Sequence, residues 1–118
     1  PRLRAVRMSA TRFRVGTGRT ATAAGKKKGI PRGTIFGLRT SEPQNVRILI
    51  ERKRGSRYTR VGTIRRANRP AGYDGIPFSG RIGSRRLAPG RYRASISATD
   101  HAGNRSKTTR RSFTVVRG

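Results

Sequence analysis

Two neighbouring residues, Asp100 and His101, have the side chains best suited to catalysis, because a carboxylate can orient an imidazole as a general base. Catalytic groups, however, usually meet through the fold, in a pocket that also supplies a nucleophile and an oxyanion site. A single histidine in a loop is typically solvated. The other acids, Glu42, Glu51 and Asp74, form no recognisable acid–base pair. The sequence therefore predicts no catalytic residue and no enzymatic activity.

Asp100, Gly103 and Asn104 supply the oxygens and the loop character of a hard-cation site. Too few ligands are visible for calcium. A turn in which Asp100 caps backbone amides, and in which Gly103 or Asn104 adopts φ > 0, accounts for the same residues. We expect these residues to be structural, with no bound metal, and we interpret Asp74-Gly75 as another turn signal.

A glycine-rich segment resembles a phosphate-binding loop only superficially. The Walker pattern requires Gly-Lys followed by Ser or Thr, and Lys27 occupies that last position in Gly25-Lys26-Lys27-Lys28-Gly29. No helix is predicted after it, and the segment has no apolar repeat of either period. We expect residues 16–29 to form a flexible basic loop without a cofactor.

Positive charge dominates the composition, with 30 Lys and Arg against 4 Asp and Glu and a net charge of +26. Arginine suits phosphates and carboxylates, so such a surface can bind polyanions. A GC-rich genome is the other source of such an arginine bias, since charge indicates partners and not fold. The candidate polyanion-binding residues are Lys26, Lys27, Lys28, Arg52, Lys53, Arg54, Arg57, Arg65, Arg66, Arg69, Arg110 and Arg111.

Length and composition fit one domain spanning residues 1–118. The chain has no cysteine, which excludes disulfides and thiolate metal sites. It also has no apolar stretch as long as a membrane span or a signal-peptide core. Because it begins at Pro1, we expect it to be part of a longer multidomain protein.

Apolar residues alternate with polar ones in several short runs, which predicts an all-β domain. Leu3–Val15 is predicted as an edge strand broken near Ser9 and Ala10. Residues 34–40 and 46–50 are predicted as two antiparallel core strands joined by a turn at Ser41-Glu42-Pro43.

The second half of the chain continues this alternation. Gly55 centres a hairpin turn at residues 53–57, and a short strand follows from Tyr58 to Ile64. Residues 65–75 read as a polar loop, and Ile76–Ile82 as a strand that Pro77 confines to an edge or a bulge. Strands at 92–98 and 112–116 complete a sandwich of about seven strands. The predicted core comprises Phe36, Leu38, Val46, Ile48, Ile50, Phe78, Leu87, Tyr92, Ala94, Ile96, Phe113 and Val115.

The segment Leu87-Ala-Pro-Gly-Arg-Tyr resembles the Leu-x-Pro-Gly-x-Tyr signature of fibronectin type III and related immunoglobulin-like sandwiches. Pro89 and Gly90 favour a turn that needs φ > 0 at its second central position, and Leu87 is expected to close the core. The resemblance implies that Tyr92 buries its ring and that its hydroxyl bonds to upstream backbone, as a tyrosine corner.

From Phe36 to Val116, the order of motifs resembles the immunoglobulin-like repeat of secreted and surface proteins of actinobacteria. These motifs are Ser-Glu-Pro before residues 45–48, Phe-Ser-Gly-Arg-Ile at 78–82, Leu-Ala-Pro-Gly-Arg-Tyr, Ala98–Ser106 and the terminal Phe-Thr-Val-Val. The chain departs from that pattern in lacking the inner-face tryptophan of fibronectin modules and the cysteine pair of antibody domains.

The resemblance implies a non-catalytic structural or adhesion module, extracellular or on the cell surface, that acts as a spacer or interaction domain. Its expected partners are neighbouring domains of the same chain and, through the basic loops, anionic envelope polymers. The alternative is an intracellular basic nucleic-acid-binding protein, and nonspecific nucleic-acid binding is expected at low salt in either case.

Overall fold

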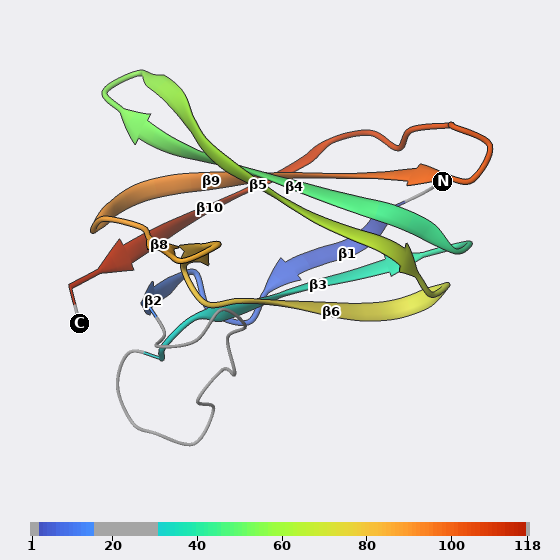
Figure 1. Ribbon diagram of the computed structural model, residues 1–118, viewed down its shortest axis with the longest axis horizontal. Helices are drawn as coiled ribbons and strands as arrows, with labels where there is room; N and C mark the ends of the chain where they lie inside the picture. The colour runs from blue at the N-terminus through green and yellow to red at the C-terminus, as the bar shows by residue number, and fades with distance from the viewer. Residues whose placement is uncertain (1–2, 16–30, 118) are drawn as a thin grey trace.

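The computed structural model describes residues 3–15 and 31–117, and within these ranges all regular secondary structure is β (Figure 1). The predicted basic loop 16–29, with Lys26, Lys27 and Lys28, lies outside the described residues. The strands are β1 (Leu3–Met8), β2 (Arg12–Arg14), β3 (Thr34–Thr40), β4 (Gln44–Arg54), β5 (Arg57–Arg69), β6 (Gly72–Phe78), β7 (Arg81–Ile82), β8 (Arg85–Arg86), β9 (Gly90–Asp100) and β10 (Thr109–Val116). The predicted all-β class is confirmed.

Two main sheets lie one above the other in a sandwich-like arrangement (Figure 1). One sheet has five strands in the order β2-β10-β9-β4-β5, and the other has three in the order β1-β3-β6. Among the described strands, pairing is antiparallel except between β2 and β10. The short strands β7 and β8 form a separate hairpin. These short strands and the division of the first predicted strand raise the number of described strands to ten, against about seven expected.

The first predicted strand is interrupted where it changes sheets. β1 pairs with β3 in the three-stranded sheet, and β2 pairs with β10 in the five-stranded sheet. Thr34 fills the gap between them, because its hydroxyl accepts a hydrogen bond from the Ala10 amide at 3.0 Å and donates to the Ala10 carbonyl at 2.8 Å. The Thr34 side chain therefore replaces the sheet pairing that the break removes.

The two predicted core strands, at residues 34–40 and 46–50, are present as β3 and β4. They belong to different sheets, however, so the turn at residues 41–43 connects one layer to the other. In β4, Val46, Ile48 and Ile50 are buried and alternate with half-buried Arg47 and Leu49. This period of two places one side of the strand in the core and the other on the outer face of the five-stranded sheet.

Residues 65–75 differ from the prediction of a polar loop with a turn at Asp74-Gly75. β5 continues to Arg69, and Asp74 lies within β6, opposite Leu38. The prediction was wrong because β5 is the outermost strand of its sheet, so many of its side chains are exposed or half-buried and show little hydrophobic alternation.

β6 forms the edge of the three-stranded sheet, as the proline within it required. The prediction of one strand from Ile76 to Ile82 was too long, because β6 ends at Phe78 and Ile82 belongs to the β7–β8 hairpin. The Ile82 side chain packs directly against Gly62. A Cβ atom added at Gly62 would lie 2.8 Å from the Ile82 Cδ1 atom. The hairpin therefore covers part of the gap between β5 and β6.

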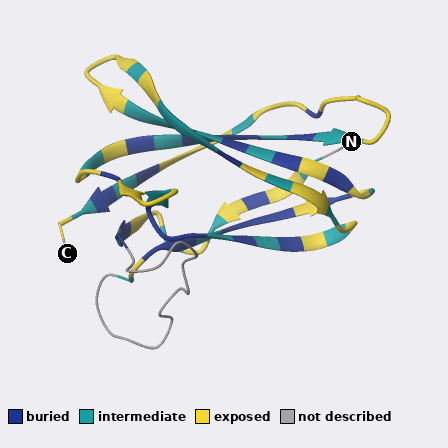
Figure 2. Ribbon diagram, in the orientation of Figure 1, coloured by how far each residue is buried: buried dark blue, intermediate teal, exposed yellow. Residues whose placement is uncertain are grey.

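The core lies between the two main sheets (Figure 2). Every residue of the predicted core is buried, and Val6, Phe13, Val15, Ile64, Ile76 and Ala98 are buried in addition. Aromatic rings cluster within this core: Phe113 stacks on Phe13 with centroids 5.4 Å apart and on Tyr92 at 5.5 Å. The cluster fixes the start of β9 against the end of β10.

Candidate polyanion-binding surface

The corner before β9 contains the predicted hydrogen bond. The Tyr92 hydroxyl donates to the Ala88 carbonyl oxygen at 2.6 Å, and the ring is 3% exposed. Burial raises the pKa of Tyr92. Leu87 is buried beside this corner, Pro89 is exposed, and Gly90 has φ +156°. These residues hold the start of β9.

The turn from Asp100 to Asn104 begins the connection between β9 and β10. The Asn104 amide donates to Asp100 Oδ1 at 2.8 Å, its side-chain nitrogen donates to Oδ2 at 3.1 Å, and Gly103 has φ +90°. Hydrogen bonds from the Asn104 backbone and side chain lower the pKa of Asp100. Among the described residues, no group of three or more His, Asp or Glu side chains could hold a metal ion. His101 is exposed at the tip of this turn.

Four of the predicted polyanion-binding arginines donate side-chain hydrogen bonds within the protein, and those of Arg52, Arg69 and Arg111 reach beyond the adjacent residue. Arg52 lies over the Tyr92 ring, 5.8 Å from its centroid, and donates to the Pro89 carbonyl at 3.1 Å. Arg69 forms two hydrogen bonds of 2.6 Å with the buried Asp74 carboxylate. Arg111 donates to the Val6 carbonyl and so joins the two sheets. The guanidinium groups of Arg52, Arg69 and Arg111 therefore stabilise the fold and are not part of the candidate polyanion-binding surface.

The outer face of the five-stranded sheet gathers cations from four of its strands. Residues that alternate with the buried positions of β4, β5, β9 and β10 project away from the core. We define the cationic face as Arg47, Lys53, Arg60, Arg65, Arg91, Arg93 and Arg110. Within the described residues, only Arg93 of this set has an ion-pair partner or a side-chain hydrogen bond.

The one carboxylate on this face is enclosed by its neighbours. Arg93 donates to Glu51 at 2.9 Å and 3.4 Å, and Ser95 donates to it at 3.3 Å. The hydrogen bond from Arg93 is the main cause that lowers the pKa of Glu51. The Arg93 guanidinium also stacks on Tyr58, 3.7 Å from the ring centroid. Glu51 therefore orients Arg93 and offsets only part of the positive charge around it.

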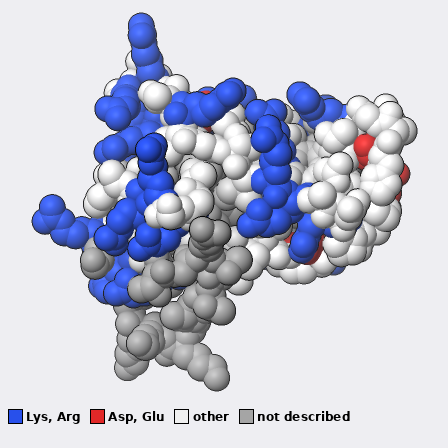
Figure 3. All heavy atoms as spheres, viewed as in Figure 1, with Lys and Arg blue, Asp and Glu red and all other residues white. Residues whose placement is uncertain are grey.

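The remaining acids are concentrated at one end of the sandwich. Glu42 lies in the turn between β3 and β4, Asp74 in β6 and Asp100 at the end of β9, and the pairing of Gln44 with Asp100 and Arg69 brings these segments together. Figure 3 shows that Lys and Arg cover much of the opposite side of the view, including the region of the β4–β5 hairpin. The molecule is therefore electrostatically polarised along the sheets.

A hollow of about 370 Å³ opens on the cationic face, and we call it the face hollow. Its lining includes two cations, Lys53 and Arg91, and the hydroxyl-bearing side chains of Thr11, Tyr58, Ser112 and Thr114. None of its lining residues is acidic.

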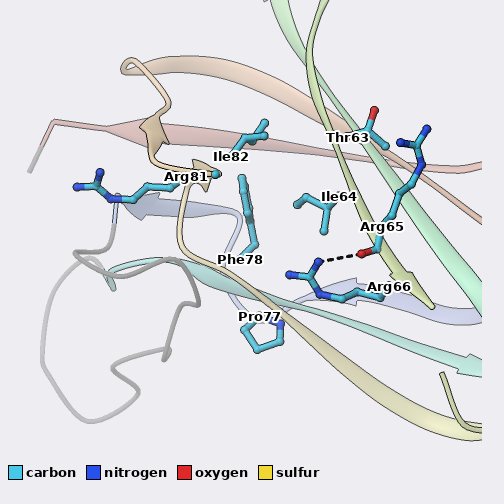
Figure 4. Close-up of a pocket in the computed structure, with 9 residues that line it drawn as sticks. Thr63, Ile64, Arg65, Arg66, Pro77, Phe78, Arg81 and Ile82 are labelled. Carbon is cyan, nitrogen blue, oxygen red and sulfur yellow. Dashed lines mark hydrogen bonds between the residues drawn. The ribbon is translucent and has the colours of Figure 1, made fainter. Parts of the chain in front are cut away.

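A second hollow, of about 230 Å³, lies between β5, β6 and β7 (Figure 4). Ile64, Phe78 and Ile82 supply much of its lining, and the guanidinium groups of Arg65 and Arg81 point away from these apolar side chains. Arg66 donates to the Arg65 carbonyl at 2.9 Å. This hollow is less suited to an anion than the face hollow.

Sequence clustering located only part of the cationic face. Lys53, Arg65 and Arg110 belong to it, and Arg54 and Arg57 lie beside it at the hairpin tip. Arg47, Arg60, Arg91 and Arg93 were missed because they are adjacent across strands and not along the chain. The outward positions of the predicted strands were the signal that could have found them.

No protein-family model matches this chain, and a comparison with curated proteins finds no match either. Within the described ranges, no helix has the length and hydrophobicity needed to span a membrane.

Proposed function

We propose that this chain is a non-catalytic immunoglobulin-like module that binds anionic polymers through its cationic face. The observation that carries the proposal is the arrangement of Arg47, Lys53, Arg60, Arg65 and Arg91 on one sheet surface, where their side chains have no ion-pair or hydrogen-bond partner among the described residues. A sheet holds such charges at fixed spacing, so a polyanion can neutralise several of them at once without ordering a loop.

The strand order supports the immunoglobulin-like assignment. If β1, β3 and β6 are strands A, B and E, then the second sheet reads A′, G, F, C and C′, with a separate first-strand segment beside the last strand. In immunoglobulin-like sandwiches, the tyrosine corner lies near the start of strand F, and Tyr92 occupies that position in β9. Both features agree with the fibronectin type III-like resemblance of the sequence.

The environments of the carboxylates support a binding role without catalysis. Glu51 is bonded to Arg93, Asp74 to Arg69 and Asp100 to Asn104. A general acid or base needs a proton-transfer partner in a cleft, and these carboxylates stabilise neighbouring groups.

We further propose that the module serves as a spacer or adhesion unit in an exported or cell-surface protein, next to other domains of the same chain. The two ends of the sandwich are free for different tasks in this arrangement, because most acids lie at one end and the exposed cations extend toward the other. Anionic envelope polymers are the partner class that fits this surface.

The salt dependence of binding tests the proposal. Binding of poly(glycerol phosphate) should weaken by about tenfold or more between 50 and 200 mM salt, because each neutralised phosphate releases counterions. A single-stranded oligonucleotide measured in parallel addresses the nucleic-acid alternative. An affinity for the polymer that does not change with salt would contradict the proposed function, as would a strong preference for the oligonucleotide.

A further inference from the structure

We infer that the face hollow binds one phosphorylated polyol or sugar unit of the anionic polymer. This inference rests on the proposed function and names the ligand class of one part of the same surface. It follows from the side chains that line the hollow, from the sheet register that places them and from the volume that they enclose.

Sheet register places four of the lining residues in two cross-strand pairs. Tyr58 pairs with Lys53 between β5 and β4, and Arg91 pairs with Thr114 between β9 and β10. The last registered pair between β4 and β9 is Arg52 with Tyr92. Lys53 and Arg91 are the next residues beyond this pair on the two strands. Directly opposed residues in a sheet have Cβ atoms about 5 Å apart, so each of the two pairs presents its polar groups side by side.

The two cations suit a phosphate group. Among the described residues, neither Lys53 nor Arg91 has an ion-pair partner or a side-chain hydrogen bond, and both are exposed. A guanidinium can bind two phosphate oxygens at once, and an ammonium adds a compact point charge. With no acid in the lining, nothing there competes for these groups.

The hydroxyl groups extend the chemistry beyond a bare anion. The Thr11, Ser112 and Thr114 hydroxyls have no hydrogen-bond partner among the described residues, so they can donate to or accept from ligand hydroxyls. The volume of about 370 Å³ is within the range of about 300–1,000 Å³ that is usual for small-molecule sites. The hollow therefore has room for a phosphate together with the polyol or sugar attached to it.

A base-free polymer fits this hollow better than a nucleic acid does. Single-stranded nucleic acids gain affinity by stacking successive bases on exposed aromatic rings. Tyr58 is the aromatic side chain on this face, and the Arg93 guanidinium already stacks on it at 3.7 Å. Little ring surface is left for a base.

Paired variants of equal charge separate a specific site from general attraction. The test variant is Lys53→Gln with Arg91→Gln, and the control is Arg47→Gln with Arg65→Gln. The control residues are opposed between β4 and β5 on the same face but do not line the hollow. With poly(glycerol phosphate) at 50 mM salt, we expect the test variant to weaken binding by about tenfold and the control by about two- to threefold. Circular dichroism establishes that both variants fold.

The outcomes distinguish the inference from the proposed function. Equal losses in the two variants would overturn the hollow as a site and leave polyanion binding by the whole face intact. No binding by the unmodified protein would overturn the proposed function itself. Tighter binding of an oligothymidine, with the larger loss in the test variant, would overturn the ligand class.

A titration of the unmodified protein gives an independent readout that needs no variant. Glycerol 3-phosphate at constant ionic strength should shift the amide resonances of Lys53, Arg91, Ser112 and Thr114 in NMR spectra. Inorganic phosphate should shift them at higher concentration only, because it cannot use the hydroxyls. Equal affinity for the two probes would overturn the polyol part of the inference.

Discussion

At the scale of single residues, Tyr92 secures the corner that starts β9. Its hydroxyl bond to Ala88 is short, and its ring stacks on Phe113 in the core. The bond therefore lies in the part of the sandwich where the aromatic rings meet. Its loss should lower the stability of the fold more than it lowers the affinity for a polyanion.

Replacing Tyr92 with Phe should lower the free energy of unfolding by about 1 kcal/mol, because the partly buried hydrogen bond to Ala88 is lost while the ring remains. Urea denaturation followed by circular dichroism measures this change. Tyr73→Phe is the matched control, since that side chain is 61% exposed and its hydroxyl has no hydrogen-bond partner among the described residues. Similar losses in both variants would mean that the corner bond contributes nothing of its own.

Glu51 should make stability depend on pH. Its folded-state pKa is lowered mainly by the Arg93 hydrogen bond, so the ionised carboxylate stabilises the fold above its unfolded pKa. This contribution is lost as pH falls through the folded pKa. Glu51→Gln should therefore cost about 1 kcal/mol at pH 7, and the difference from the unmodified protein should shrink as the pH falls below the ordinary carboxyl pKa of 4.5.

Urea denaturation at several pH values measures the Glu51 effect. Arg93→Gln combined with Glu51→Gln serves as the control, because the double variant lacks the pair and should show the same shallow pH dependence as Glu51→Gln alone. A stability difference between the unmodified protein and Glu51→Gln that does not narrow as the pH is lowered would contradict the role given to this carboxylate.

At the scale of elements, the first strand depends on a side chain from β3. Thr34 is fully buried and bonds both backbone groups of Ala10 at the break between β1 and β2. Thr34→Val keeps the shape of the side chain but leaves these backbone groups without their partner. We expect a loss of about 1–3 kcal/mol in the free energy of unfolding, measured by urea denaturation.

Thr40→Val is the matched control for Thr34. Thr40 is also buried in β3, but its hydroxyl makes one long bond of 3.4 Å to the Pro70 carbonyl. Its replacement should cost distinctly less. A loss at Thr40 as large as that at Thr34 would show that the two hydroxyls are equivalent, and that the break gains no special support from Thr34.

Elements with one buried side could be predicted from the sequence, and elements without one could not. β4 alternates buried Val46, Ile48 and Ile50 with outward-facing residues, so this strand could be predicted from its hydrophobic pattern. The end of β5 is an outermost segment rich in exposed arginine, and it resembled a loop. The change of sheet between β1 and β2 was visible in the sequence only as an interruption of the hydrophobic alternation. Thr34 is distant from Ala10 along the chain, so no local sequence pattern could predict the hydrogen bond between them.

The cationic face, too, could be predicted only where its residues are neighbours along the chain. Clusters along the chain, such as residues 52–57, were visible in the sequence, but Arg52 folds back onto Tyr92 and leaves the exposed set. Arg47 and Arg91 join the cationic face only through strand pairing. The sequence therefore indicated the charge and the class of partner, whereas the sheet register determined which cations act together.

At the scale of the whole molecule, the unequal distribution of charge is the main property of the surface. Acidic residues concentrate at the end formed by the turns after β3, β5 and β9, and the five-stranded sheet presents the cationic face. A polyanion should therefore approach in a preferred orientation and bind along this sheet.

Two triple variants with the same loss of charge test this account most directly. Arg60, Arg65 and Arg110 are changed to Gln on the cationic face, and Arg4, Arg7 and Arg39, exposed on β1 and β3 of the other sheet, are changed to Gln as the control. The measurement is the affinity for poly(glycerol phosphate) as a function of salt. We predict that the face variant binds about tenfold more weakly with a shallower salt slope, and that the control stays within about twofold of the unmodified protein. Equal weakening in both variants would show that net charge alone attracts the polymer, and would contradict a binding face on the five-stranded sheet.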